Sequence, residues 1–220
     1  MNFRITPLRS TDFLPRENPT GEKLLSRAEK PFQVWIPKDH LIVLGNSQDP
    51  EIELNVDSVV KDQIPVYKRM SGGGTVLLSN GCICIGLRFR KSKELGIHDY
   101  FLHGSGLIQK VVRSELDIEL TQRGISDLVY EDKKISGCAM YMPKDFVLYL
   151  VSILVDPDFD EIQKYLAHPS KEPDYRGQRT HRNFLTSLAI ASGKTIESSK
   201  LVKAFEKSIE EKMTDSLDWI

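Results

Sequence analysis

The chain has 220 residues and a formal net charge of -1, because 31 acidic residues offset 30 basic ones. This balance excludes a strongly basic nucleic-acid binder, and no apolar run reaches membrane-spanning length. We therefore expect neither nucleic acid nor a membrane as partner. The length predicts a single domain over residues 1–220.

Cysteine usage and the N-terminus bear on the cellular compartment. Cys82, Cys84 and Cys138 form an odd set with no CxxC pair and no partnering histidines, so we expect neither a disulfide framework nor a metal site. The first twenty residues carry charges and prolines where a signal peptide would carry an apolar core. The sequence therefore predicts a protein of the reducing cytoplasm.

The N-terminal half predicts short strands with two helices among them. Asn18-Pro19 is typical of a helix cap followed by proline at the first helical position, and Pro31 ends that helix. Alternating or wholly apolar runs predict strands at 3–5, 32–36, 41–44, 64–66 and 82–90. Between them we expect a turn-rich loop at 45–50 and a helix at 56–62.

The C-terminal half predicts longer elements. Residues 97–116 carry apolar side chains at helical spacing, and the ten-residue run 146–155 is typical of a central strand. We also expect a turn and strand at 124–130, a charged turn at 132–137, helices at 160–166, 184–191 and 198–213, and a surface loop at 167–182. Because the strands between 64 and 90 look connected by hairpins, this order favours an α+β fold with a mixed, largely antiparallel sheet flanked by helices.

Three consecutive glycines stand within Lys68-Arg69-Met70-Ser71-Gly72-Gly73-Gly74-Thr75-Val76. Such a run costs backbone entropy, so it needs a local reason, either a positive φ or a ligand against the main chain. The two cations indicate an anionic ligand, whose phosphate or carboxylate oxygens the bare glycine amides could cradle. A hairpin with solvated cations is the simpler alternative, and the Gly-Lys-Ser/Thr of a Walker loop is missing.

A second segment, Asp132-Lys133-Lys134-Ile135-Ser136-Gly137-Cys138-Ala139, places a lysine just before small residues. An ammonium at Lys134 could reach into a site whose walls lack bulk and stabilise developing negative charge there. Taken alone, a solvated turn lysine is the commoner case.

Together the two segments resemble the signature of the biotin/lipoate ligase superfamily, in its lipoate-protein ligase A-like branch. The family's Arg-Arg-x-Ser-Gly-Gly-Gly-Thr/Ala-Val is similar to residues 68–76, and its Asp-Arg-Lys-x-Ser-Gly-x-Ala is similar to residues 132–139. The resemblance runs over residues 21–188 and implies the family's catalytic-domain fold, a mixed sheet flanked by helices.

The resemblance also implies an activity. The family activates lipoate or octanoate with ATP and Mg²⁺ as an acyl-adenylate and passes the acyl group to a lysine of a lipoyl domain or glycine-cleavage H protein. Lys134 would be the catalytic residue, and Arg69 would clamp phosphate or carboxylate oxygens. The other residues expected to bind substrate or nucleotide are Ser71, Gly72, Gly73, Gly74, Thr75, Asp127, Ser136, Gly137 and Ala139.

The chain also departs from the family pattern. Lys68 replaces the first arginine, and Cys82 falls where many members have asparagine. Leu78 stands where relatives carry histidine or glutamine, and Leu150 where many carry histidine. We expect no C-terminal accessory domain. This leaves two alternatives to a self-sufficient ligase: a separate partner chain, or transfer of an acyl group that is already activated.

Three other functions stay open. One is biotin ligation, although the Gly-Arg-Gly-Arg pattern of those enzymes is absent. An octanoyl or lipoyl transferase would pass the acyl group through a cysteine thioester, for which Cys138 is the candidate, although a packed core cysteine is the simpler interpretation. A non-catalytic lipoate-binding paralogue would explain the departures at Leu78, Cys82 and Leu150, whereas Arg69 and Lys134 favour an enzyme. The basic segment 176–182 could meet the acidic surface of an acceptor protein.

Overall fold

The computed structural model describes residues 30–215, so the strand expected at 3–5 and the helix expected from Asn18 lie outside the described residues. A six-stranded sheet dominates the fold, and every neighbouring pair of its strands is antiparallel. Its order is β1 (Phe32–Trp35), β5 (Cys82–Arg90), β9 (Phe146–Leu154), β8 (Lys133–Tyr141), β7 (Asp127–Tyr130) and β6 (Thr121–Arg123). The predicted α+β class with a largely antiparallel sheet is confirmed.

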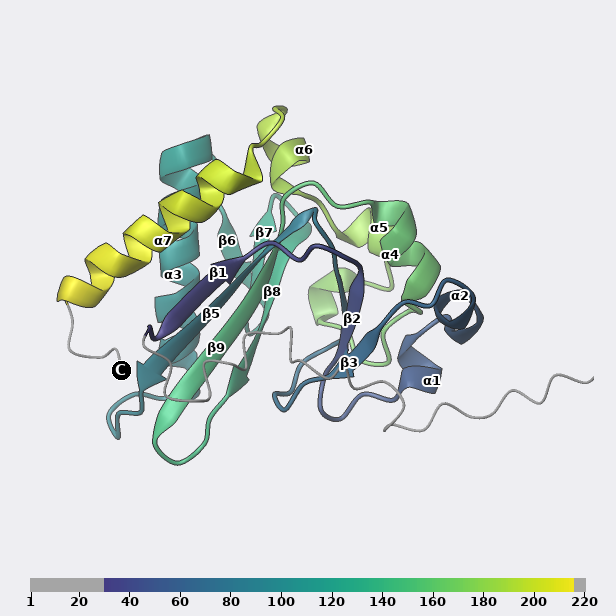
Figure 1. The fold of residues 1–220 in the computed structure, drawn as a ribbon, viewed down its shortest axis with the longest axis horizontal. Coiled ribbons are helices and arrows are strands. Elements are labelled where there is room, and N and C mark those ends of the chain that lie inside the picture. Colours follow the sequence, from purple (N-terminus) through teal and green to yellow (C-terminus); the bar gives the residue numbers. More distant parts are fainter. Residues whose placement is uncertain (1–29, 216–220) are drawn as a thin grey trace, which may run out of the picture.

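Two long helices, α3 (Ile97–Leu116) and α7 (Ser198–Asp215), lie over one face of this sheet (Figure 1). The predicted apolar stripe of α3 is buried there, with side chains such as Phe101, Ile108 and Val111. Their partners on the sheet alternate along each strand, for instance Ile83, Ile85 and Leu87 on β5. This face is therefore filled by the main hydrophobic core and leaves the other face to carry a site.

A second, three-stranded sheet lies beside the first (Figure 1). Its centre is β2 (Leu41–Leu44), which pairs in parallel with β3 (Val66–Lys68) and antiparallel with β4 (Val76–Leu78). The expected hairpins between residues 64 and 90 are therefore wrong: β3 and β4 flank β2, and β5 belongs to the larger sheet. The fully apolar β2 takes the central place because it is buried throughout its length.

Short helices surround the smaller sheet on its outer side (Figure 1). They are α1 (Pro50–Glu53), α2 (Val56–Lys61), α4 (Phe159–Tyr165) and α5 (His181–Phe184), with a single 3₁₀ turn η2 (Asp174–Arg176) in the long connection from α4 to α5. The helix α6 (Leu188–Ser192) then leads to α7. Helix α1 was not expected; Pro50 starts it, and the side chain of Asp49 caps it by accepting from Glu51 N.

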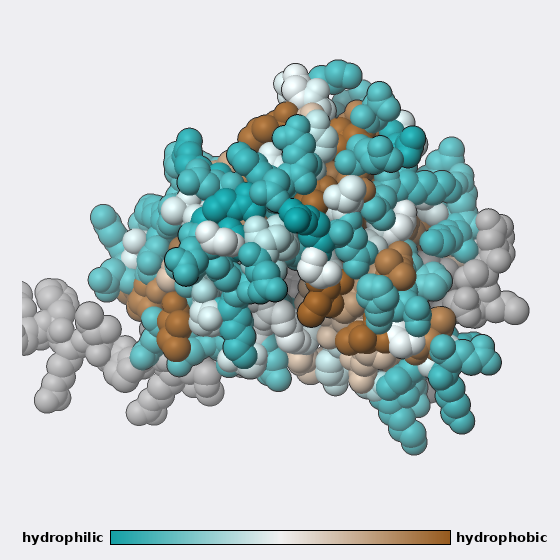
Figure 2. Space-filling view, turned by 180° about the vertical axis from the view of Figure 1, so that it is seen from behind, coloured by the Kyte–Doolittle hydropathy of each residue, from teal (hydrophilic) through white to brown (hydrophobic). Residues whose placement is uncertain are grey.

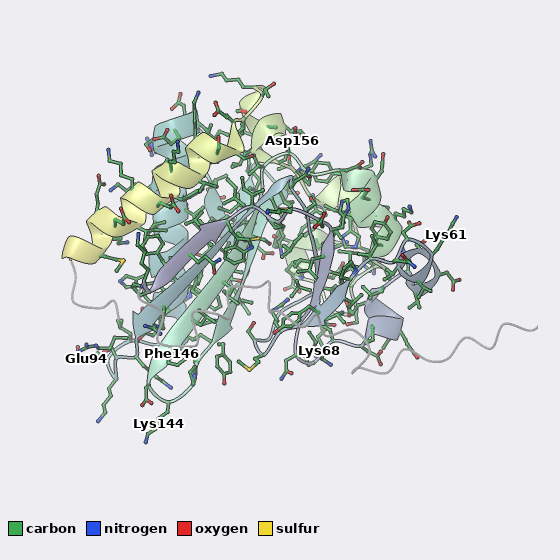
Figure 3. The ribbon with its side chains drawn as sticks, viewed as in Figure 1. Lys61, Lys68, Glu94, Lys144, Phe146 and Asp156 are labelled. Atoms are coloured by element: carbon green, nitrogen blue, oxygen red, sulfur yellow. The ribbon has the colours of Figure 1, made fainter. Side chains whose placement is uncertain are left out.

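The prediction of 146–155 as a central strand is confirmed, because β9 has neighbours on both sides. Figure 3 labels Phe146, the first residue of this strand, and Asp156, which follows two residues after the strand ends at Leu154. The charged turn expected at 132–137 holds only for Asp132, since Lys133 begins the nine-residue strand β8. The small and polar side chains of β8 do not give the apolar pattern of a strand, because one face of β8 lines a cavity and does not pack in the hydrophobic core.

Among the described residues, no helix is long and apolar enough to cross a membrane. The back of the molecule is mostly hydrophilic, with separate patches of apolar residues (Figure 2). Exposed large apolar side chains such as Ile97, Ile125 and Ile190 come from different elements, as isolated surface residues commonly do.

Candidate functional site

A cleft of about 120 Å³ lies between the two sheets, on the face of the larger sheet that the long helices leave free. Its floor follows the strand register: Trp35 of β1 pairs with Cys84 of β5, Cys84 with Ser152 of β9, and Ser152 with Gly137 of β8. These four residues all line the cleft. Cys84, Ser152 and Gly137 are small, so the floor is low across these three strands. The indole of Trp35 bounds it at one end.

The cleft is mostly apolar. Val43, Val76 and Leu78 of the smaller sheet form its roof, and Leu150 joins the floor beside Ala139. Leu78 packs with Cys84 in a cluster that spans both sheets. Leu78 and Leu150, the two leucines that depart from the family pattern, therefore line the same cleft. Each places an apolar side chain on its wall where many relatives have a polar one.

The glycine-rich segment forms the rim of the cleft. Gly73 has a positive φ of 99°, and a Cβ on Gly45 would stand 2.0 Å from its carbonyl oxygen, so the two loops touch through backbone. A Cβ on Gly72 or Gly74 would meet nothing within 4 Å. The prediction that a glycine leaves room against the main chain thus fits Gly72 and Gly74, whereas Gly73 serves backbone conformation.

Arg69 is buried at 7% exposure and donates into this rim. Its Nη2 lies 2.9 Å from the carbonyl oxygen of Gly72 and 2.7 Å from that of Gly74, and its Nε lies 3.1 Å from the Gly72 oxygen. The sequence predicts an anion clamp here; the structure shows a guanidinium that shapes the glycine loop by binding its carbonyls.

Two hydroxyls of the same segment are buried, and among the described residues they have no hydrogen-bond partner. They are Ser71 Oγ and Thr75 Oγ1. Thr75 also lines the cleft, so its hydroxyl can bind a ligand there. A buried hydroxyl without a partner costs free energy, which a hydrogen bond to a ligand would recover.

A β-bulge directs Lys134 into the cleft. Leu128 of β7 pairs with Ser136, but the next residue, Val129, pairs with Lys134, so β8 carries one extra residue, Ile135. In a regular strand, residues 134 and 137 would point to opposite faces, because the side-chain period is two. The bulge puts both on the cleft face, and a Cβ on Gly137 would stand 3.0 Å from Lys134 Nζ.

The ammonium of Lys134 is held by a carboxylate from the neighbouring strand. Lys134 Nζ lies 2.8 Å from Asp127 Oδ1, and the two side chains are 27% and 12% exposed. The other oxygen of Asp127 accepts a hydrogen bond from the hydroxyl of Tyr175, which the sequence analysis missed. Asp127 thus partners Lys134, and its expected contact with substrate or nucleotide stays a prediction.

The residues expected at the site divide into two groups. Those that line the cleft together are Arg69, Gly74, Thr75, Lys134, Gly137 and Ala139. Those that do not line it are Ser71, Gly72, Gly73, Asp127 and Ser136. Ser136 pairs with the core residue Ile153, is buried at 2% exposure, and lies on the helix-covered face because it alternates with Gly137. Trp35 and Ser152 were missed, since only the register of β1, β5, β9 and β8 brings them to Gly137.

Cys138 is a poor nucleophile in this setting. Burial raises the pKa of its thiol to about 11, with smaller opposing effects that include a hydrogen bond to the Ser126 carbonyl. At neutral pH the sulfur is therefore protonated, and the thiolate that a thioester route needs is scarce.

The basic segment 176–182 is bound largely within the protein. The guanidinium of Arg176 is buried over the Phe184 ring at 4.8 Å, and Arg179 donates to the carbonyl of Tyr175 at 2.7 Å. Arg182 pairs with Asp160 on the surface. Arg176 and Arg179 thus hold the connection between α4 and α5, whereas the exposed Arg182 ties α5 to α4 and stays accessible at the surface.

The described residues contain no group of three or more His, Cys, Asp or Glu side chains placed to hold a metal ion. The cleft instead offers one ammonium, one buried hydroxyl, open space beside two glycines and an apolar interior. Such a site suits an anionic head group with an apolar tail.

Comparisons with known proteins show which chains this one is similar to. A probable lipoate-protein ligase A of Mycoplasma pneumoniae is 34% identical over 125 residues, 57% of this chain and 36% of that protein. An inactive lipoate–protein ligase 2 of Plasmodium falciparum is 25% identical over 81% of this chain and 56% of that protein. The chain thus covers between about a third and just over half of the length of these curated relatives.

Two solved structures share the fold. A lipoate-protein ligase A bound with ATP matches with a TM-score of 0.71 and 19% identity, over 88% of this chain and 78% of that one. A bi-partite lipoate protein ligase of Thermoplasma acidophilum, studied with its E2 lipoyl domain, matches with a TM-score of 0.70 and 20% identity, over 83% and 71%. The family model for the lipoyl protein ligase A/B catalytic domain matches residues 22–210. The chain therefore belongs to the lipoyl protein ligase A/B catalytic domain family.

Proposed function

We propose that this chain activates lipoate or octanoate with ATP and passes the acyl group to a lysine of a lipoyl domain or glycine-cleavage H protein. The observation that carries the proposal is the ammonium of Lys134, which the bulge of β8 turns onto an apolar cleft. The ligase relatives, and the ATP that the structural neighbour binds, support the same reading.

The first step would join acid and nucleotide. A carboxylate oxygen of the acid attacks the α-phosphorus of ATP, and pyrophosphate leaves. Lys134 lies where its charge can hold the carboxylate and then the phosphoryl oxygens, which favours the transition state. The alkyl or dithiolane tail takes the apolar cleft between Val43, Val76 and Leu150, and water is thereby kept from the activated acid.

The second step would move the acyl group. The amine of the acceptor lysine attacks the acyl carbon, AMP leaves with the carboxylate oxygen, and the amine loses a proton.

Mg²⁺ would enter with the phosphates of ATP, because such ions keep most of their contacts to phosphate and water. The lack of a carboxylate cage among the described residues fits that mode of binding.

We further propose that this catalytic domain acts in the cytoplasm with a separate accessory chain as its partner. The bi-partite ligase among the structural neighbours supports a partner chain, and its lipoyl domain supports the class of acceptor. The protonated thiol of Cys138 argues against the alternative route through a thioester.

The deciding measurement is lipoate-dependent release of pyrophosphate from ATP-Mg²⁺ by the purified chain, repeated with octanoate. We expect Lys134→Ala to lower the rate by at least about a hundredfold, since one donor to a developing anion is worth that much. Lys133→Ala is the matched control, because the neighbouring lysine is exposed and lies outside the cleft, and it should keep the rate.

Two other outcomes would redirect the proposal. Folded wild-type chain that releases no pyrophosphate, even with octanoate, would remove self-sufficient activation. Acyl transfer from an activated donor that is lost in Cys138→Ser would then establish the thioester route. Lipoate binding without either reaction would identify a non-catalytic paralogue, for which the apolar Leu78 and Leu150 would be the structural reason.

A further inference from the structure

The Lys134–Asp127 ion pair has a third member outside the sheet. Tyr175 lies in η2, within the long connection between α4 and α5, far from both residues in the sequence. Its hydroxyl donates to Asp127 Oδ2 at 2.8 Å, while Asp127 Oδ1 lies 2.8 Å from Lys134 Nζ. One carboxylate therefore bridges a phenol and an ammonium, one on each of its oxygens.

The ring of Tyr175 is fixed from several sides. The guanidinium of Arg123 lies 5.0 Å from its centre, and the Phe184 ring packs at a centroid distance of 5.2 Å. Its backbone carbonyl accepts from Arg179 Nη2 at 2.7 Å. Burial, followed by the charge of Asp127, raises the pKa of Tyr175, so the hydroxyl keeps its proton and remains a donor. These contacts hold the phenol in one place before any ligand binds.

We propose that Tyr175 is a positioning residue for the reaction, acting through Asp127 to set the direction of the Lys134 ammonium. A carboxylate with a single partner can rotate, and the lysine then follows it. With one oxygen held by Tyr175, the carboxylate presents its other oxygen in a fixed direction. The ammonium is consequently aimed at the cleft in the free protein, which lowers the cost of orienting it in the transition state.

The inference rests on the proposed function for its catalytic part only, and one readout is independent of activity. Lysine ε-carbons are labelled with ¹³C in the full chain, and the Lys134 signal is assigned with Lys134→Arg. Tyr175→Phe keeps the ring and removes only the hydroxyl. In this variant we expect the NMR order parameter of the Lys134 ε-carbon to fall. An unchanged Lys134 signal would overturn the inference, whether or not the wild-type chain is active.

The chain provides a matched control outside the cleft. Tyr165 donates to Asp62 Oδ2 at 2.9 Å, and Lys164 contacts the same oxygen, so the same three residue types meet without a bridging carboxylate. Tyr165→Phe should leave Lys134 as it is, while Tyr175→Phe should loosen it. Loosening of Lys134 by both variants would show a general loss of order and would count against the inference.

Kinetics provide the second arm if the wild-type chain releases pyrophosphate. We expect kcat in Tyr175→Phe to fall by about tenfold, with KM for lipoate changed less than about twofold, because one charge-assisted hydrogen bond orients the lysine and none touches the tail. The same hydroxyl loss in an Asp127→Asn background should have little further effect. An unchanged kcat, or fully independent effects of the two substitutions, would overturn the inference. A wild-type chain without activity would remove the proposed function and leave the labelling result to decide the placement of Lys134.

Discussion

At the scale of single residues, the site depends on bulk as much as on charge. Lys134 enters the cleft over a residue without a side chain, and its Cε and Nζ would both stand 3.0 Å from a Cβ on Gly137. The end of a lysine is flexible, so added bulk at 137 moves the ammonium more readily than it moves the sheet. Position 137 therefore controls where the charge lies.

Gly137→Val should lower the rate of acid-dependent pyrophosphate release by about ten- to a hundredfold, because displacement of a catalytic group by about 1 Å has that effect. Gly137→Ala should give a smaller loss of the same kind. Thermal unfolding and circular dichroism should show both variants folded. A Gly137→Val protein with the wild-type rate would contradict the placement of Lys134 beside this glycine.

His181, at the start of α5, makes stability depend on pH. It is 7% exposed, with Nε2 2.9 Å from the Ala167 carbonyl, and burial lowers its pKa despite that hydrogen bond. A pKa that is lower in the folded state than in the unfolded state means that neutral His181 stabilises the fold above the unfolded pKa, and that this stability is lost as pH falls toward the folded pKa.

We therefore expect the free energy of unfolding, measured with urea between about pH 7 and about pH 5, to decrease less on acidification in His181→Asn than in the wild type. His40 and His168 pair with Glu161 and Glu172, and both pairs are present in the two proteins, so the difference between the curves isolates His181. Parallel curves would contradict the prediction.

At the scale of elements, regular apolar periodicity made some segments predictable. Helix α3 has the predicted bounds, 97–116, and β9 has the predicted central place, because their patterns are set by burial against one core. The sequence predicts a turn for the first part of β8, because Gly137 and Ala139 line a cleft and do not alternate as core residues would. Strand β6 is short and largely exposed, so it carries no apolar signal at all.

The packing of α3 on β9 gives a prediction at this scale. A Cβ on Gly104 would stand 2.6 Å from the ring of Tyr149, whereas one on Gly106 would meet nothing within 4 Å. Gly104→Ala should lower the free energy of unfolding by about 1–3 kcal/mol through overpacking. Gly106→Ala should raise it by about 0.5–1 kcal/mol, because alanine favours the helix. Urea titrations measure both, and equal effects would contradict this packing.

At the scale of the whole molecule, the site belongs to neither sheet alone. Its floor comes from the larger sheet and its roof from the smaller one, and Leu78 packs on Cys84 between them. The two motifs predicted the polar rim, with Arg69, Thr75 and Lys134. The floor residues Trp35 and Ser152 could not be predicted, because strand pairing over long sequence distances places them there.

A ligand that fills this cleft contacts both sheets and should stabilise the whole fold. At a free lipoate concentration about a hundredfold above Kd, the free energy of unfolding should rise by about 2.7 kcal/mol. Ser152→Phe, which puts a ring on the low centre of the floor, should abolish that gain, and butanoate, with its shorter tail, should give less of it. Thermal shift assays test all three, and equal shifts with lipoate and butanoate would contradict binding of the tail in the cleft.

The bulge in β8 has a consequence for identifying the lysine segment in other sequences and for engineering it into other proteins. Ile135 is the unpaired residue of the bulge. It reverses the side-chain alternation after it, so that Lys134 and Gly137, three residues apart, lie on the same face of the sheet. The four letters Lys-Ile-Ser-Gly copied into a regular strand would show the lysine to one side and the glycine to the other. The motif can therefore be grafted onto another protein only together with its bulge. A chain with the same four residues in a regular strand would not bring the lysine and the glycine to one cleft.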